Sequence, residues 1–209
     1  MKDNKGFSLV EIVIILAIMA AISGTIFYSY NLMSGQYARE CANNLSTALD
    51  KAKNYALTRS ASVDCYMEVV KDGNNYLARY YGPESAIAEG NDLNGDGADW
   101  LFAEEYKIGK SRATITYKIG SGSEITIDDD TSVKFVYNRI NGAMKAIVES
   151  DATEPAAAGG VRRGYIPPDT ESSVHTLNGD KVIIALSYGR RYEIELFTAT
   201  GKHVLSKIG

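Results

Sequence analysis

The chain has few of the residues on which catalytic and metal centres are usually built. Only two of its 209 residues are histidine and two are cysteine. The cysteines form no CxxC pair and have no histidine nearby in sequence, which disfavours a zinc site. No serine or cysteine lies in a recognisable nucleophile motif, and His175 and His203 are expected at the surface rather than as catalytic bases. The sequence therefore favours a protein that is not an enzyme.

The two cysteines leave two interpretations open. Cys41 lies in a predicted helix and Cys65 in a predicted strand. Outside the cytoplasm they either pair, which would join the helix to the sheet, or remain two buried thiols that pack as small apolar groups.

Strong positive charge is also missing. The net charge is -4 and the isoelectric point is near 5.3, and no basic run follows the N-terminus, so direct binding to nucleic acid is not expected. The acidic run 128–130 is interpreted as a solvated turn, and no glycine loop suited to phosphate is evident.

Proline is absent before Pro83, and this absence permits one long helix. We expect it to run from Phe7 to near Arg59, about 80 Å at 1.5 Å per residue. Its second half is amphipathic, because small and apolar residues recur at spacings of four and three. These residues are Ala38, Ala42, Leu45, Leu49, Ala52 and Ala56.

The first half of this helix is apolar on nearly all sides. No charge occurs from Ile12 to Ala38, and the strongly apolar part, Ile12 to Tyr30, is close to the roughly 20 residues that cross a bilayer. We therefore expect a transmembrane half at about residues 7–30. Lys2 and Lys5 precede it, which favours a cytoplasmic N-terminus and a C-terminal domain outside the cytoplasm.

A secretory signal peptide is the alternative reading of this segment. Two features oppose it, namely the carboxylate of Glu11 near the start of the apolar run and the continuation of the helical pattern far beyond any cleavage site. A charge near the middle of a membrane helix costs roughly 2.5 to 3.5 kcal/mol on insertion scales. Glu11 is therefore interpreted as functional.

The stretch Lys5-Gly6-Phe7-Ser8-Leu9-Val10-Glu11 resembles the processing site of type IV prepilins and type II secretion pseudopilins. The resemblance implies a leader at 1–6, cleavage by prepilin peptidase between Gly6 and Phe7, and N-methylation of Phe7. It also implies that Glu11 pairs with the N-terminal amine of a neighbouring subunit during filament assembly. Such a pair is physically coherent, because two opposite charges in an apolar setting reduce each other's desolvation cost.

Residues 60–209 change to a strand pattern and are expected to form an antiparallel β-rich domain. The long helix packed on this sheet domain gives an α+β fold. A hairpin is expected across Lys71-Asp72-Gly73, with further turns at Asn141-Gly142 and Gly189-Arg190. The predicted strands are 63–70, 74–81, 113–119, 133–137, 143–149, 181–188 and 192–198. The order of these elements resembles the GspH and FimT class of minor pseudopilins and minor pilins.

Two loops attract separate hypotheses. The spacing DxNxDG in residues 92–97 places oxygen ligands at alternate positions around a glycine turn, as Ca²⁺ requires. The candidate ligands are Asp92, Asn94, Asp96 and Asp99, but the twelfth position of the motif is Ala103 rather than glutamate. A metal-free acidic turn is the alternative.

The second loop, 150–176, contains three prolines, Pro155, Pro167 and Pro168, and an Ala-Gly stretch, and is read as an irregular excursion between strands. It is either a contact surface for a subunit or cargo, or an insertion without a partner.

Together these observations predict a structural subunit, with the resemblance favouring a minor one, of a type IV pilus or of a secretion or competence pseudopilus. Its expected partners are prepilin peptidase, the membrane and other pilin subunits, with the assembly ATPase and platform proteins acting indirectly. It is expected to be a single-pass protein of the cytoplasmic membrane before assembly and part of a filament afterwards. The alternative is an uncleaved, membrane-anchored extracellular binding domain or enzyme.

Overall fold

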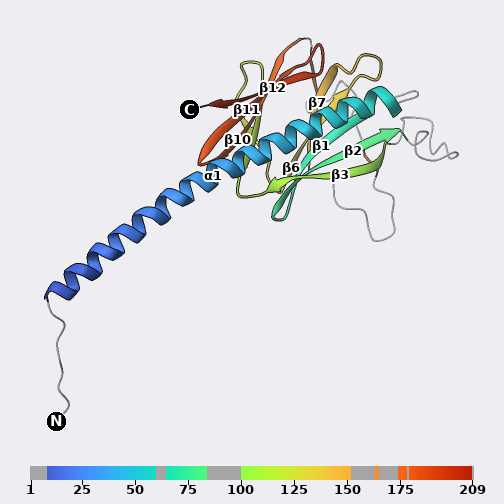
Figure 1. Cartoon of the computed structure of the whole chain (residues 1–209). Coiled ribbons are helices and arrows are strands. Elements are labelled where there is room, and N and C mark those ends of the chain that lie inside the picture. Colours follow the sequence, from blue (N-terminus) through green and yellow to red (C-terminus); the bar gives the residue numbers. More distant parts are fainter. Residues whose placement is uncertain are drawn as a thin grey trace.

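A computed structural model describes residues 9–59, 65–83, 100–151, 163–164, 174–177 and 179–208. In this part of the chain it contains one helix, α1 (Leu9–Arg59), and two antiparallel β-sheets. The first half of α1 extends away from the sheets, and the second half lies across them (Figure 1). The predicted α+β class, with a long N-terminal helix on antiparallel sheet, is therefore confirmed.

Helix α1 is continuous over 51 residues, which corresponds to about 75 Å. Neither Gly24 nor Gly35 interrupts it, because an isolated glycine costs a helix only about 1 kcal/mol and proline is absent from this segment. The prediction placed the start of the helix at Phe7, and residues 1–8 lie outside the described part of the chain.

The larger sheet has seven strands in the order β8-β3-β2-β1-β6-β7-β9. β1 pairs with β2 on one side and with β6 on the other. The strands of this larger sheet are β1 (Cys65–Asp72), β2 (Asn75–Pro83), β3 (Trp100–Lys110), β6 (Thr131–Tyr137), β7 (Met144–Asp151), β8 (Arg163–Gly164) and β9 (Val174–Thr176).

The smaller sheet has five strands in the order β12-β11-β10-β4-β5. β10 is central, since it pairs with β11 along its whole length and with β4 from Val182 to Ser187. Its strands are β4 (Thr114–Ile119), β5 (Ile125–Thr126), β10 (Lys181–Tyr188), β11 (Arg190–Phe197) and β12 (Lys202–Ile208).

The main core forms where the second half of α1 meets both sheets. The predicted stripe from Ala38 to Ala56 is confirmed, because each of its six members is at most 4% exposed. Leu45 and Leu49 provide the large side chains, and burying each of them contributes about 1.5 to 3 kcal/mol. Alanine at the other four positions lets the sheets approach the helix closely.

Two hydrogen bonds fix the axial position of α1 on the larger sheet. Tyr80 of β2 donates its hydroxyl hydrogen to the carbonyl of Ala48 at 3.0 Å, and Asn44 donates its amide to the carbonyl of Ile108 at 2.9 Å. Both acceptors are main-chain groups. Sliding the helix by one turn would therefore break both bonds.

The two sheets are joined at the end of the domain that lies furthest from the N-terminal half of α1. Met144 N donates to Thr198 O at 2.8 Å, and Lys53 Nζ of the helix donates to Thr200 O at 2.8 Å. Gly142 and Gly201 lie against each other here, and both have positive φ, 67° and 60°. A side chain on Gly201 would collide with the carbonyl of Gly142.

Seven predicted strands correspond to β1, β2, β4, β6, β7, β10 and β11, with ends shifted by a few residues. The first hairpin turns at Gly73-Asn74, one residue later than the centre of the predicted turn, because Asp72 pairs with Asn75. β3, β5 and β12 were not predicted. The loop 150–176 is not wholly irregular, since β8 pairs with β3 and β9 pairs with β7; residues 152–162 and 165–173 lie outside the described residues.

Cys41 and Cys65 are two buried thiols that are not joined to each other. Cys41 faces β3, where Gly109 follows a bulge between Lys107 and Gly109 in the pairing with β2. A Cβ added at Gly109 would collide with Cys41 Sγ and would lie 3.2 Å from Tyr37 Oη. The thiol therefore fills the space that the glycine leaves.

We expect Gly109→Ala to lower the free energy of unfolding by about 1 to 3 kcal/mol, because it overpacks the contact between α1 and β3. Chemical denaturation of the full chain in detergent measures the change. The Gly109→Ala/Cys41→Ala double variant removes the colliding sulfur and should recover part of the loss relative to the sum of the single variants. Additive effects of the two substitutions would contradict this account.

Candidate functional site

The first candidate site is the exposed half of α1. Leu9–Ser29 has a mean hydropathy of 2.5, and none of it is buried against the domain. In the described part of the chain it is the one helix that is long and apolar enough to cross a membrane. Leu9 is 80% exposed and Phe27 72% exposed. An apolar surface of this size is unfavourable in water, and its length and composition suit a membrane span.

Glu11 lies in the first turn of α1 and is exposed on this apolar surface. It is the one acidic or basic residue between Leu9 and Ser29. A carboxylate is favoured at a helix N-terminus by roughly 0.3 to 1 kcal/mol through the helix dipole, which offsets part of the cost of an apolar environment. The fold thus presents one acidic group to whatever covers the helix.

Two groups of predicted site residues lie outside the described residues. They are the processing residues Gly6 and Phe7, and the calcium candidates Asp92, Asn94, Asp96 and Asp99. The calcium site remains a prediction. Among the residues that the structure does describe, no group of three or more His, Cys, Asp or Glu side chains is placed to hold a metal ion.

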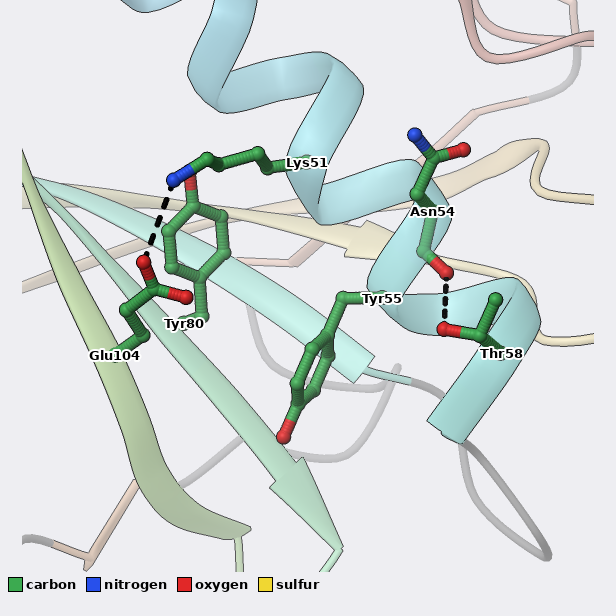
Figure 2. A pocket seen from close by; sticks show the side chains of 6 residues that line it. All are labelled: Lys51, Asn54, Tyr55, Thr58, Tyr80 and Glu104. Atoms are coloured by element: carbon green, nitrogen blue, oxygen red, sulfur yellow. Dashed lines mark hydrogen bonds and ion pairs between the residues drawn. The ribbon is translucent and has the colours of Figure 1, made fainter.

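A small open pocket of about 220 Å³ lies between the C-terminal part of α1 and the strands β2 and β3 (Figure 2). Its lining residues are Lys51, Asn54, Tyr55, Thr58, Tyr80 and Glu104. Lys51 Nζ lies 3.3 Å from Glu104 Oε1 and 4.6 Å from the centre of the Tyr106 ring. The pocket contains a cation, a carboxylate and aromatic walls, but no nucleophile beside a base.

A second polar cluster joins β12 to α1. His203 Nε2 lies 2.6 Å from Ser46 Oγ, and His203 Nδ1 lies 3.9 Å from Asp50 Oδ1. The side chain of His203 is only 7% exposed. The expectation that His203 is a surface residue is therefore wrong, because β12 is a strand that places this ring against the helix. His175, on β9, is exposed as expected and lies 3.4 Å from Glu149.

The Ser46–His203–Asp50 cluster has the residue types of a hydrolase triad but not its geometry. Asp50 is too far from the ring for a hydrogen bond. Ser46 lies in the middle of α1, where main-chain N–H groups are bonded within the helix and leave no oxyanion hole beside it. The cluster therefore attaches the last strand to the helix and does not form a catalytic centre.

A third polar group is buried in the larger sheet and was missed by the sequence analysis. Glu68 of β1 and Lys134 of β6 are cross-strand partners and are 0% and 5% exposed. Ser132 donates to Glu68 Oε1 at 2.7 Å, and Tyr81 donates to Oε2 at 3.3 Å. Burial lowers the pKa of Lys134, and the Glu68 carboxylate works against that shift. The signal in the sequence was a single charge inside each of two apolar strand runs.

Comparison with protein families gives one match. Residues 1–27 match the family described as Prokaryotic N-terminal methylation motif, the signature of type IV prepilins and pseudopilins. Comparisons with curated proteins and with solved structures give no match. The N-terminal segment therefore carries this signature, as predicted, while the likeness of residues 60–209 to the GspH and FimT class remains a prediction.

The motif and the exposed apolar helix together support a type IV pilin or pseudopilin that is a substrate of prepilin peptidase and is anchored in a membrane. They favour a structural subunit over an enzyme.

Burial predicts how His203 affects stability at different pH values. Burial lowers the pKa of His203, Asp50 opposes this shift, and Lys53 adds to it. The folded state therefore binds the proton less readily than the unfolded chain, whose histidine titrates near pH 6.5. The stability that the neutral His203 ring allows is fully present above about pH 6.5. As the pH falls from there toward the folded-state pKa, protonation of the unfolded chain lowers the free energy of unfolding.

We expect His203→Gln to reduce the fall in unfolding free energy between about pH 7 and pH 5, measured by denaturation in detergent. The control is His175→Gln, which removes the other imidazole and leaves the Ser46–His203 contact in place. An unchanged pH slope in His203→Gln would show that this ring does not couple stability to pH.

Proposed function

We propose that the chain is a subunit of a type IV pilus or of a secretion or competence pseudopilus, polymerised through α1 after removal of its leader. The observation that carries the proposal is continuity: the methylation motif at residues 1–27 runs directly into an exposed apolar helix, and the same helix becomes the core of the domain. Processing then falls between Gly6 and Phe7, with a methyl group on the new amine of Phe7.

Assembly follows from the exposed surface of Leu9–Ser29. In the membrane, lipid covers this surface; in a filament, the same helices of neighbouring subunits cover it, so the apolar area stays out of water throughout. Packing among helices, rather than escape from water, must then favour the filament, because lipid is as apolar as the side chains. In addition, one pair of opposite charges sets the axial position of each subunit relative to its neighbour.

Glu11 supplies the negative member of that pair, and the methylated amine of a neighbouring chain supplies the positive member. Each charge alone is costly in an apolar environment, and the cost falls when the two meet. A subunit that enters at the wrong height leaves both charges without this partner. Glu11 would therefore select the correct axial position rather than increase affinity alone.

The remaining parts of the proposal concern location and partners. The charges of Lys2 and Lys5 support a cytoplasmic N-terminus and a domain on the other side of the membrane. Prepilin peptidase acts first, other pilin subunits bind through α1, and an ATPase with its platform proteins drives extraction. The order of strands supports a minor subunit of the GspH and FimT class.

Processing is tested by the intact mass and N-terminal fragments of the chain from its native host, with and without prepilin peptidase. We expect a mature chain that begins at methylated Phe7 only when the peptidase is present. Gly6→Leu should remain uncleaved, whereas Gly24→Leu, within α1 and with open space at its Cβ, should be processed. A chain that retains Met1 beside an active peptidase would indicate an ordinary membrane anchor.

The role of Glu11 is tested by filament incorporation. Glu11→Ala should be cleaved normally but enter filaments at least about tenfold less, since a factor of ten corresponds to only about 1.4 kcal/mol. The control Val10→Ala removes apolar volume from the adjacent position without changing charge. Quantitative immunoblotting of sheared filaments against total mature chain gives the ratio. Normal incorporation of Glu11→Ala would disprove the positioning role.

A further inference from the structure

The part of the domain nearest to the membrane anchor is defined by contacts of α1. Gly35 of α1 lies against Arg190, the first residue of β11, and a Cβ added at Gly35 would lie 2.7 Å from Arg190 Cδ. Gly35 is six residues beyond Ser29, the last residue of the apolar span, which corresponds to about 9 Å along the helix. The domain therefore begins very close to the bilayer.

Two other segments lie at the same end. The hydroxyl of Tyr37 donates to Lys110 O at 2.8 Å, so the turn between β3 and β4 lies beside the helix two residues further on. Lys207 and Ile208 pair with Tyr192 and Arg191, so β12 ends next to the start of β11. In Figure 1 these ends of β3, β11 and β12 lie on the side of the domain from which the N-terminal half of α1 extends.

These segments carry a cluster that we name the basic rim, consisting of Lys110, Arg112, Arg190 and Lys207. All four residues are exposed. No ion pair joins any of them to another residue in the described part of the chain. The rim thus places four positive charges at one end of a chain whose net charge is -4.

Most acidic residues near this end are exposed but take part in ion pairs or hydrogen bonds. Arg191 pairs with Glu124 and Glu193, Arg79 pairs with Asp72, and Lys71 pairs with Asp129 at 2.7 Å. Asp128 accepts hydrogen bonds from the turn that contains it. Three exposed acidic residues at this end form no ion pair in the described part of the chain: Glu40 on α1, and Asp128 and Asp130 in the loop before β6.

We propose that the basic rim binds the surface of an anionic lipid bilayer while α1 spans it. The inference rests on the membrane anchoring assigned to Leu9–Ser29. Head groups extend roughly 5 to 7 Å beyond the hydrocarbon core, so a rim that starts about 9 Å from the end of the span lies within one screening length of them. Each Lys or Arg near an anionic surface shifts the contact equilibrium about fivefold.

This contact gives the domain a function before assembly. It holds the domain against the bilayer, which prevents α1 from sinking further and fixes the depth of Glu11 at the other end of the span. Because Arg190 and Lys207 lie on the side of the smaller sheet, and Asp128 and Asp130 lie by the larger sheet, the domain tilts so that β11 and β12 approach the lipid. Extraction into a filament must break this contact.

The test uses the full chain in lipid nanodiscs. A donor dye on Thr114→Cys, an exposed position at the start of β4, reports distance to acceptor-labelled lipid, since both native thiols are buried. We expect greater energy transfer in discs that contain phosphatidylglycerol than in discs of phosphatidylcholine alone, and we expect high salt to remove the difference.

A matched pair of substitutions separates the rim from general charge effects. Lys207→Glu should abolish most of the lipid dependence. Lys202→Glu makes the same change of charge at the other end of β12, beside the contact of Lys53 with Thr200. Lys53 lies about 27 Å further along α1 than Gly35, so this position is far from the bilayer. Lys202→Glu should therefore retain the lipid dependence. The double variant Lys207→Glu/Arg112→Glu should show no lipid dependence.

Equal transfer in neutral and anionic discs, or an equal loss in Lys202→Glu and Lys207→Glu, would overturn the proposal. Cleavage at Gly6 and pairing by Glu11 do not enter this measurement, so failure of the pilin pathway would leave a positive result standing. A chain that does not enter the discs would contradict the anchor and this proposal together.

Discussion

The burial of one continuous helix in two different environments is the constraint on which the rest of the structure depends. Over Leu9–Ser29 the helix is apolar on nearly all sides and is not buried against the domain; from Ala38 to Ala56 it is apolar along one stripe that both sheets cover. The change from an all-round apolar surface to a stripe takes place within about ten residues. This change separates the membrane-spanning part of α1 from the part that packs in the domain. Glu11 lies on the membrane side of it, and the basic rim lies at the domain side.

Much of this architecture is predictable from the sequence, because helix and strand periodicity are local properties. The stripe of α1 and strands such as β6 and β10 are long apolar patterns of the right period. β3 was missed because Glu104 and Glu105 are adjacent and because two irregularities in its pairing with β2 break the alternation. β12 was missed because an edge strand needs few apolar residues: its burial alternates between half-buried and exposed positions.

The candidate sites also divide into those that local sequence patterns reveal and those that depend on contacts between distant residues. Glu11 and the motif around Gly6 are contiguous in sequence, so local reasoning was sufficient to select them. The contact of Ser46 with His203 joins residues 157 positions apart, and no pattern in either segment specifies the other. Ser46 and Asp50 do lie one helical turn apart beside the apolar stripe, which was a weak indication of a polar contact. The pairing of Glu68 with Lys134 likewise depends on the register of β1 against β6.

The central place of β10 has a consequence for folding. β4 belongs to the middle of the chain and β11 to its end, and β10 joins them by pairing with both. The edge of β4 that pairs with β10 therefore stays unpaired until residues 181–188 are available. Non-local pairings of this kind fold slowly and expose aggregation-prone edges while they wait. Until then the free edge of β4 can pair with a strand of another chain, so correct closure of the smaller sheet depends on the timely arrival of β10.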